Sequence, residues 1–182
     1  MTVGLGTGST AYFVVEGLGE RVKSGLGSTG IPTSERTATQ ARSLGIDLAT
    51  FAEHPTIDLT IDGADEVERG SLNLIKGRGG ALLREKIVAA ASRRLVIVVD
   101  QEKLVDRLGD HTPVPVEVVQ FGWQATAASL AKLGAEPVLR HAHEDHPFIT
   151  DGGNYTLDCR FSRITDGKEL ERQINAIVGV VD

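Results

Sequence analysis

The sequence predicts an α/β fold: a parallel-sheet, Rossmann-like domain with helices on both faces, followed by a smaller α+β domain of the ferredoxin-like type. Segments with strand and helix patterns alternate through residues 1–112, as expected when helices connect parallel strands. Near Pro113 the pattern changes to the order β-α-β-β-α, which is half or more of a ferredoxin-like unit. We therefore expect a catalytic Rossmann-like domain over residues 1–112 and the smaller domain over residues 113–182.

The first elements are indicated by hydrophobic spacing and by residues that cap helices. Thr2 to Leu5 is expected to be the end of a strand, and a helix is expected from about Thr10 to Val22, with apolar residues on one side. Gly25 to Pro32 is expected to be a loop. Ser34 or Thr37 can then cap a second helix, which the next glycine ends.

Further strands and a helix complete the first domain. A short strand is expected at Ile46 to Ala49 and a clearer one at Ile57 to Ile61, which an Asp-Gly pair ends. Gly80 to Ser92 has apolar residues at helical spacing and predicts a helix. The continuous aliphatic run from Leu95 to Val99 is typical of a buried parallel strand.

The second domain is expected to contain three extended segments and two helices. The extended segments are predicted at Val114–Val119, Pro137–Arg140 and Tyr155–Cys159, and the helices at Trp123–Leu133 and about Lys168–Val178. Asp166 and Glu169 have the spacing of a capping box before the second helix. These segments give the β-α-β-β-α order on which the domain assignment depends.

Composition excludes several functional classes. The 182 residues carry a net charge of −6, whereas a general nucleic-acid binder needs a basic face. Cys159 is the one cysteine, so no internal disulfide can form. No run approaches the roughly 20 apolar residues of a membrane helix, and no secretory signal is visible. We expect a soluble, cytoplasmic protein that binds neither nucleic acid nor membrane.

A glycine-rich turn follows the first strand. Gly4 to Thr10 reads Gly-Leu-Gly-Thr-Gly-Ser-Thr and opens the first helix, where backbone N–H groups and the helix dipole favour an anion such as phosphate. A dinucleotide-binding fingerprint would require glycine where Ser9 stands, and the lysine of a Walker loop is absent. The alternative interpretation is a tight strand-to-helix turn without a ligand.

Two aspartates follow the strand at Ile57 to Ile61. Asp62 and Asp65 lie in the run Asp-Gly-Ala-Asp-Glu, in which Gly63 permits a sharp bend. Close carboxylates raise one pKa, so that one can act as an acid while the other remains a base. Ligands of doubly wound sheets bind beyond the carboxyl ends of the strands, which favours a functional pair. A solvated Asp-Gly turn is the alternative.

A lysine beside a second glycine-rich loop is the third polar feature. Lys76 precedes the glycine-rich stretch Gly77 to Gly80, and a lysine in that position can neutralise a developing oxyanion. Glu85 follows about one and a half turns into the predicted helix, between Arg84 and Lys86. Neighbouring residues of a helix point in different directions, and a solvated charged helix face is the alternative for this triplet.

Two remaining candidates are weaker. Lys103 follows the Leu95 to Val99 strand and could reach a phosphate or a sugar oxygen, although an isolated surface lysine is the usual interpretation. The run His141 to His146 has the H-x-H-x-D-H spacing of zinc hydrolases of the metallo-β-lactamase type, but such sites need further histidines downstream and no histidine follows His146. We expect an exposed loop or hairpin there and no metal.

Together these motifs resemble the type A ribose-5-phosphate isomerase family, and the matching segments occur in family order over nearly the whole chain. They are Gly4–Ala11, Asp62–Glu66, Lys76–Lys86, Asp100–Lys103, Pro113–Val118 and Asp151–Asn154. The resemblance implies interconversion of ribose 5-phosphate and ribulose 5-phosphate in the non-oxidative pentose phosphate branch. It also implies a homodimer and no metal or organic cofactor.

The resemblance assigns roles to individual residues. Glu85 matches the family's proton acceptor, Asp62 and Asp65 match the aspartates that bind substrate and assist ring opening and proton transfer at oxygen, and Lys76 matches the catalytic loop lysine. The implied substrate-binding set is Thr7, Gly8, Ser9, Thr10, Asp62, Gly63, Ala64, Asp65, Lys76, Gly77, Arg78, Gly79 and Lys103.

Compared with the family, the chain is expected to be shortened at both ends. Relatives begin with a helix before the first strand and continue past the segment that is here Asn175 to Val181. A non-catalytic domain that binds or senses a sugar phosphate is therefore the alternative function. The joint presence of two aspartates, Lys76 and Glu85 favours catalysis, because a sensor needs no base beside the reacting carbons.

Overall fold

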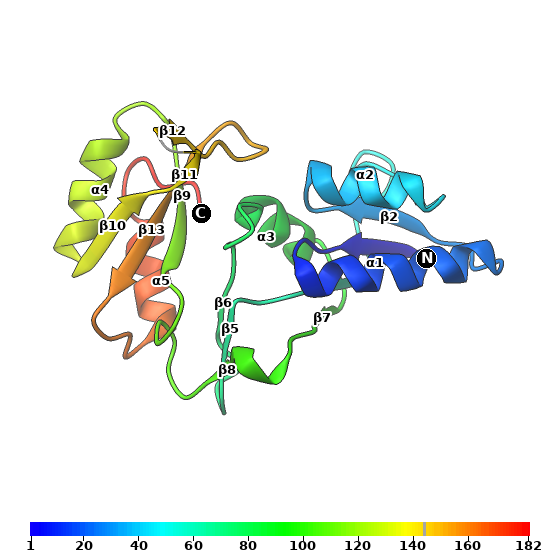
Figure 1. The fold of residues 1–182 in the computed structure, drawn as a ribbon, viewed down its shortest axis with the longest axis horizontal. Helices are drawn as coiled ribbons and strands as arrows, with labels where there is room; N and C mark the ends of the chain where they lie inside the picture. The colour runs from blue at the N-terminus through cyan, green and yellow to red at the C-terminus, as the bar shows by residue number, and fades with distance from the viewer. Residues whose placement is uncertain (144) are drawn as a thin grey trace. The chain divides into compact units, whose positions relative to one another are not determined.

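The computed structural model describes residues 1–143 and 145–182, which divide into two compact units. Unit 1 contains Met1–Gly63 and Arg84–Val99, and unit 2 contains Ala64–Leu83 and Asp100–Asp182. The units therefore interleave along the chain, whereas the sequence suggested a single division between residues 112 and 113. Figure 1 shows the elements of each unit as a ribbon.

Unit 1 is built on a five-stranded parallel sheet with the strand order β3-β2-β1-β4-β7, and this confirms the expected α/β fold. The strands are β1 (Thr2–Leu5), β2 (Thr29–Pro32), β3 (Asp47–Leu48), β4 (Leu59–Asp62) and β7 (Leu95–Ile97). The helices connected to them are α1 (Ser9–Lys23), α2 (Glu35–Ser43) and α3 (Leu82–Ala90).

Helices cover both faces of this sheet, as expected, because successive side chains of a strand point to opposite faces. Val3 and Leu5 of β1 pack in one cluster with Val15 of α1 and a buried alanine of α2. Gly4 lies between them and faces the other side, where an added Cβ atom would be 2.7 Å from Cγ1 of Val88 in α3. Alternation along one short strand thus places α1 and α2 on one face and α3 on the other.

Two expectations for unit 1 are wrong. The predicted loop from Gly25 to Pro32 contains β2, which pairs in parallel with β1. A Cβ atom at Gly30 would lie 2.6 Å from the Leu5 side chain, so close packing requires glycine there. Glycine is unfavourable inside strands, and for that reason the sequence pattern did not indicate one. The aliphatic run from Leu95 to Val99 is not fully buried: β7 is the last strand of the order above, and Leu95 is 43% exposed.

Unit 2 contains a three-stranded antiparallel sheet with the order β10-β13-β9. Its elements are β9 (Val114–Val118), α4 (Trp123–Lys132), β10 (Ala135–Leu139), β13 (Tyr155–Phe161) and α5 (Gly167–Asn175). Because β9 and β10 both run antiparallel to β13, β9-α4-β10 is a split β-α-β unit. This arrangement confirms the β-α-β-β-α order predicted for the smaller domain.

The two faces of this sheet differ in character. Val116 of β9 and Leu157 of β13 are buried in one hydrophobic cluster with Leu130 of α4. The alternate positions, which include the register partners Pro115 and Asp158, point to the opposite face. The apolar face is therefore covered by helices, and the opposite face is left to polar side chains.

A second, smaller sheet explains why the units interleave. It has the order β6-β5-β8 and consists of β5 (Glu66–Glu68), β6 (Leu74–Ile75) and β8 (Leu104–Val105). Ile75 and Val105 pack with Ile164, which precedes α5. Strands this short carry no readable periodicity in the sequence, so the division by sequence pattern missed them.

Short elements complete the description. A 3-10 helix, η1, spans Gln101–Lys103, and β11 (His141–His143) pairs antiparallel with β12 (His146–Pro147). This hairpin agrees with the exposed loop or hairpin predicted for the histidine run. No helix in the described part of the chain is long and apolar enough to cross a membrane.

Candidate active site

In unit 1, Asp62 lies at the carboxyl end of β4, beside the end of the adjacent strand β1. Its carboxylate oxygen Oδ1 accepts hydrogen bonds from the backbone N–H of Thr7 at 3.1 Å and of Gly63 at 2.8 Å. The residue is only 2% exposed. Backbone donors on two sides therefore fix this carboxylate at the edge of the sheet where ligands of such folds bind.

Glycine is required where the backbone passes Asp62. A Cβ atom added at Gly6 would lie 2.6 Å from the Cα atom of Asp62, which is closer than side-chain carbons come to backbone atoms. The Gly6 N–H also donates to the carbonyl of Ile61 at 3.0 Å. The glycine-rich turn therefore brings the start of α1 next to the strand-end carboxylate.

The start of α1 presents backbone donors. Gly8 precedes the helix with φ 129°, and no side chain of the described residues caps it. The N–H groups of a first turn have no partner within the helix, so the amides of Ser9 and Thr10 suit an anion. The Thr7 hydroxyl instead lies in a buried cluster, with Thr33 Oγ1 at 2.7 Å and Ser34 Oγ at 2.8 Å.

Glu85 is buried, unlike the charged residues next to it in the sequence. It lies in the first turn of α3 and is 3% exposed, whereas Lys86 is exposed. Arg84 points elsewhere and makes an ion pair at 2.9 Å with Glu35 of α2, which holds the pKa of the Glu35 carboxyl below its usual value. The interpretation of this triplet as a solvated helix face is therefore wrong for Glu85.

In unit 2, Asp65 is fastened to the glycine-rich loop that contains Lys76. The Asp65 N–H donates to the carbonyl of Ile75 at 2.8 Å, and the Arg78 N–H donates to Asp65 Oδ2 at 2.9 Å. Lys76 lies directly after β6, between these two contacts in the sequence. The structure thus brings together Asp65 and the Lys76 to Gly80 loop.

The glycines of this loop have individual structural reasons. Gly77 has φ 98°, and a Cβ atom there would lie 2.7 Å from Cβ of Leu82. Gly80 has φ 78°, and its Cβ would collide with the ring of Phe148. Both positions combine a left-handed backbone with close packing, so L side chains are excluded and the loop keeps one shape.

Arg140 is a residue of the loop's surroundings that sequence reasoning missed. Its guanidinium pairs with both carboxylate oxygens of Asp158, and one nitrogen donates to the carbonyls of Gly77, at 3.3 Å, and Arg78, at 3.0 Å. Arg140 therefore fixes the glycine-rich loop from the side of the three-stranded sheet. Arginine after an extended segment has no distinctive pattern, so the sequence offered no signal for this role.

Glu66, the last residue of the Asp-Gly-Ala-Asp-Glu run, has a structural task. It is 1% exposed, and its carboxylate accepts backbone N–H donors from Gly109 at 2.6 Å, His111 at 2.8 Å and Thr112 at 2.6 Å. Charge-assisted bonds of this kind are stronger than neutral ones. Glu66 therefore holds the 109–112 segment against the strand that follows Asp65.

The remaining predicted residues lie as follows. Gly63 is the last residue of unit 1 and Ala64 the first of unit 2. Lys103 ends η1, and its N–H donates to the carbonyl of Asp100 at 3.2 Å. Gly79 lies in the turn that the Gly80 N–H to Gly77 carbonyl bond closes at 2.9 Å.

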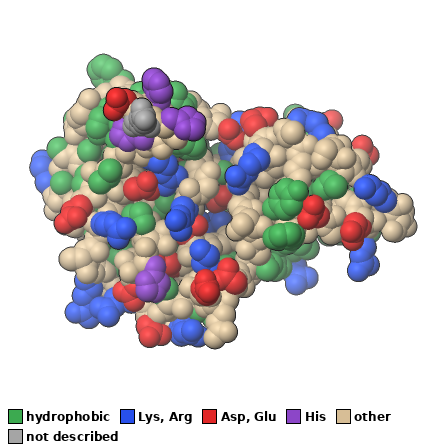
Figure 2. All heavy atoms as spheres, in the orientation of Figure 1, with side chains coloured by type: hydrophobic (Ala, Val, Ile, Leu, Met, Phe, Trp, Pro, Cys, Tyr) green, Lys and Arg blue, Asp and Glu red, His purple; other side chains and the backbone are tan. Residues whose placement is uncertain are grey.

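The histidine run does not form a metal site in the described part of the chain. Exposed histidine side chains gather over the β11–β12 hairpin (Figure 2). No group of three or more His, Cys, Asp or Glu side chains among the described residues is placed to hold a metal ion. Glu144, which belongs to this run, lies outside the described residues.

A buried strand-end carboxylate beside a helix N-terminus suits proton transfer on a small anionic substrate. Fold and site together define an α/β protein with a candidate site for acid–base chemistry. The family model for ribose 5-phosphate isomerase A (phosphoriboisomerase A) matches residues 29–182. The chain belongs to this family.

Similar proteins agree with this membership. Ribose-5-phosphate isomerase A of Gloeobacter violaceus is 64% identical over the whole chain, which covers 79% of that protein, and the Synechococcus protein of the same name is 57% identical. Among solved structures, the ribose 5-phosphate isomerase A of Methanocaldococcus jannaschii has a TM-score of 0.96 at 43% identity, with 81% of its chain covered. A D-ribose-5-phosphate isomerase in complex with phospho-erythronic acid has a TM-score of 0.96 at 41% identity, with 80% covered.

Proposed function

We propose that this chain interconverts D-ribose 5-phosphate and D-ribulose 5-phosphate in the non-oxidative pentose phosphate branch, and that Glu85 is the base. Membership of the isomerase family supports the activity. The observation that carries the role of Glu85 is its burial in the first turn of α3, directly after the lysine-containing loop in the sequence. A carboxylate shielded from water in this way is suited to exchange protons with carbon.

The reaction requires a proton to move between two neighbouring carbons. In the open-chain aldose, Glu85 takes the proton from C2 while the carbonyl oxygen at C1 gains electron density, which forms an enediolate. The protonated carboxyl then returns a proton to C1, and the carbonyl forms at C2. One correctly placed carboxylate can therefore serve both carbons.

The oxygens of the intermediate need stabilisation and proton transfer. We assign charge stabilisation to Lys76 and to N–H groups of the glycine-rich loop, because a fixed cation and fixed dipoles act strongly where water is excluded. We assign ring opening and proton transfer at oxygen to Asp62 and Asp65. The backbone contacts that fix both carboxylates support these assignments, because catalysis depends on positioned groups.

The phosphate serves as the handle that aligns the reacting carbons. Gly8, Ser9 and Thr10 at the start of α1 provide backbone donors for it, and Lys103 supplies a further positive charge. Thr7 contributes through its hold on Asp62, since its hydroxyl is used in the buried cluster. Phospho-erythronic acid, the ligand of the solved relative, is the analogue we expect to bind here.

Three further points belong to this proposal. The enzyme acts in the cytoplasm, it works as a homodimer, and it needs no metal or organic cofactor. A symmetric dimer is the commonest form of soluble assembly. The competing function, binding of a sugar phosphate without turnover, would require the phosphate handle but no buried base.

The test is an isomerase assay on the 182-residue chain and on two variants. Glu85→Gln is expected to lose at least about 100-fold in kcat because the amide cannot accept the proton. Glu20→Gln, an exposed glutamate on α1, is the matched control and is expected to retain full activity. Equal rates for the chain and Glu85→Gln would contradict the role of Glu85. Absence of turnover together with binding of phospho-erythronic acid would support the sensing function instead.

A further inference from the structure

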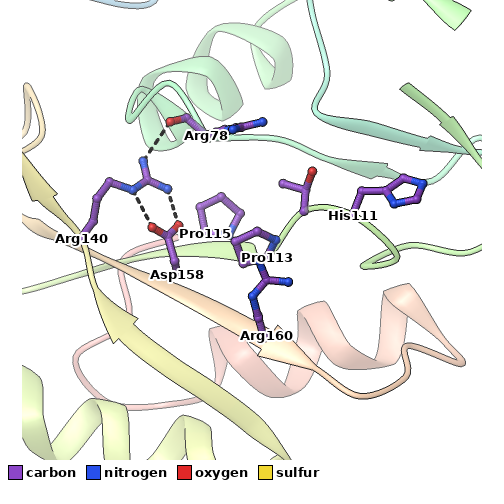
Figure 3. A pocket seen from close by; sticks show the side chains of 8 residues that line it. Arg78, His111, Pro113, Pro115, Arg140, Asp158 and Arg160 are labelled. Atoms are coloured by element: carbon purple, nitrogen blue, oxygen red, sulfur yellow. Dashed lines mark hydrogen bonds and ion pairs between the residues drawn. The ribbon is translucent and has the colours of Figure 1, made fainter. Parts of the chain in front are cut away.

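A polar cavity lies entirely within unit 2, on the face of the β10-β13-β9 sheet that the helices leave uncovered. Its volume is about 400 Å³, which falls within the roughly 300–1,000 Å³ typical of small-molecule sites. Figure 3 shows the side chains that line it. They are Arg78, His111, Thr112, Pro113, Pro115, Arg140, Asp158 and Arg160.

The fold brings these residues together through strand alternation. Asp158 and Arg160 are two apart on β13 and therefore point to the same face, as does Pro115, the register partner of Asp158. Arg78 arrives from the glycine-rich loop, which Arg140 fastens through its carbonyls. Glu66 holds His111 and Thr112 by their backbone N–H groups, so the far wall of the cavity is fixed as well.

The cavity concentrates positive charge in an acidic protein. Three arginines against one aspartate leave a net charge of +2 with His111 neutral, although the whole chain carries −6. Asp158 neutralises Arg140 by a two-bonded ion pair. Among the residues that the structure describes, neither the Arg78 nor the Arg160 guanidinium has an ion pair. Like charges lining one cavity repel one another, and an anionic ligand removes that repulsion.

We propose that this cavity binds the phosphate group of a small phosphorylated metabolite. A phosphate monoester carries a charge of about −1.5 to −2 at pH 7, which balances the +2 of the lining. Two guanidinium forks match phosphate oxygens in geometry as well as in charge. The Thr112 hydroxyl supplies one more polar group, while Pro113 and Pro115 provide an apolar wall for the carbon part of the ligand.

This site is additional to the phosphate handle at the start of α1. The handle consists of the backbone donors of Gly8, Ser9 and Thr10 together with Lys103, and none of these residues lines the cavity. Arg78 contacts both regions through different atoms. Its backbone N–H donates to Asp65, and its side chain lines the cavity. A ligand in the cavity therefore contacts the same loop that carries Lys76.

The test is titration of the ¹⁵N-labelled 182-residue chain with inorganic phosphate, followed by two-dimensional NMR and compared with sodium chloride at equal ionic strength. The backbone amide resonances of Thr112, Asp158 and Arg160 are expected to shift with phosphate but not with sodium chloride, and to give the same dissociation constant. The amides of Ser9 and Thr10 report phosphate binding at the start of α1 separately. Failure of the cavity proposal can therefore be distinguished from failure of the proposed function.

Two matched arginine variants make the test specific. Arg160→Gln is expected to weaken the phosphate affinity reported by Thr112 and Asp158 at least about tenfold, because one charged hydrogen-bonding partner is lost. Arg163→Gln, three residues further along and outside the cavity, is expected to leave it unchanged. The proposal is overturned if the cavity amides respond equally to phosphate and chloride, or if Arg160→Gln binds phosphate as tightly as the unmodified chain.

Discussion

Replacement of Glu66 by glutamine is expected to loosen the 109–112 segment. The carboxylate of Glu66 accepts three backbone N–H donors at 2.6–2.8 Å while being 1% exposed. In Glu66→Gln the amide oxygen can replace Oε1, which serves His111 and Thr112. The amide NH2 group then faces the N–H of Gly109, so one hydrogen bond is replaced by two opposed donors.

The magnitude follows from the three bonds. A hydrogen bond to a charged group contributes about 1.5–3 kcal/mol and a neutral one about 0.5–1.5 kcal/mol. Loss of one charged bond and weakening of the other two gives an expected decrease of about 3 kcal/mol in the free energy of local opening. Since 1.4 kcal/mol is a factor of ten, the amides of residues 109–112 should exchange with deuterium about 100-fold faster.

Hydrogen–deuterium exchange measured by NMR resolves these amides individually. Glu68→Gln is the control, because Glu68 lies two residues further along β5 and accepts from Ser71 and Asn73 instead. It is expected to leave exchange of residues 109–112 unchanged. If Glu66→Gln accelerates their exchange no more than Glu68→Gln does, the buried carboxylate is not what holds the segment.

Three further outcomes are expected. Gly6→Ala should reduce kcat/KM at least about tenfold in a steady-state assay, because its Cβ displaces Asp62. Gly17→Ala has open space around its Cβ and is the control, which should instead stabilise α1 by about 0.5–1 kcal/mol in urea unfolding. Burial raises the pKa of the Cys159 thiol from 9.0 to about 12, so the folded protein should not react with a thiol reagent at pH 8. The free energy of unfolding should also fall as the pH rises from 9 towards 12, because only the unfolded thiol ionises in that range. Rapid labelling of the folded chain would contradict this. Ser34→Ala should destabilise the protein by about 1–2 kcal/mol in urea unfolding, since Ser34 caps α2; an unchanged midpoint would show that the cap contributes nothing.

The parallel sheet and the main order of elements could be predicted from the sequence because they depend on local patterns. Ser34 is the N-cap of α2, Asp166 caps α5, and both were visible as capping residues. The polar residues after β1 and β4 could be placed because parallel strands end at one edge of a sheet. Hydrophobic periodicity and cap chemistry are short-range signals, so they survive without knowledge of tertiary contacts.

What could not be predicted depends on contacts distant in sequence. Position 30 in β2 requires glycine because the Leu5 side chain leaves no space for a Cβ atom there. No local sequence pattern carries that information. The Arg140 contact with the carbonyls of Gly77 and Arg78 joins residues more than sixty positions apart. The β6-β5-β8 sheet is assembled from strands of two or three residues, too short for alternation to be read.

Isomerisation in D2O tests the central claim most directly, namely that Glu85 moves a proton between C1 and C2. The account predicts that ribulose 5-phosphate formed by the 182-residue chain carries solvent deuterium at C1, seen by NMR, because the proton on a carboxyl group exchanges with solvent. Glu85→Gln should slow this incorporation at least about 100-fold. A Glu85→Gln variant that forms ribulose 5-phosphate and incorporates deuterium as fast as the unmodified chain would contradict the account.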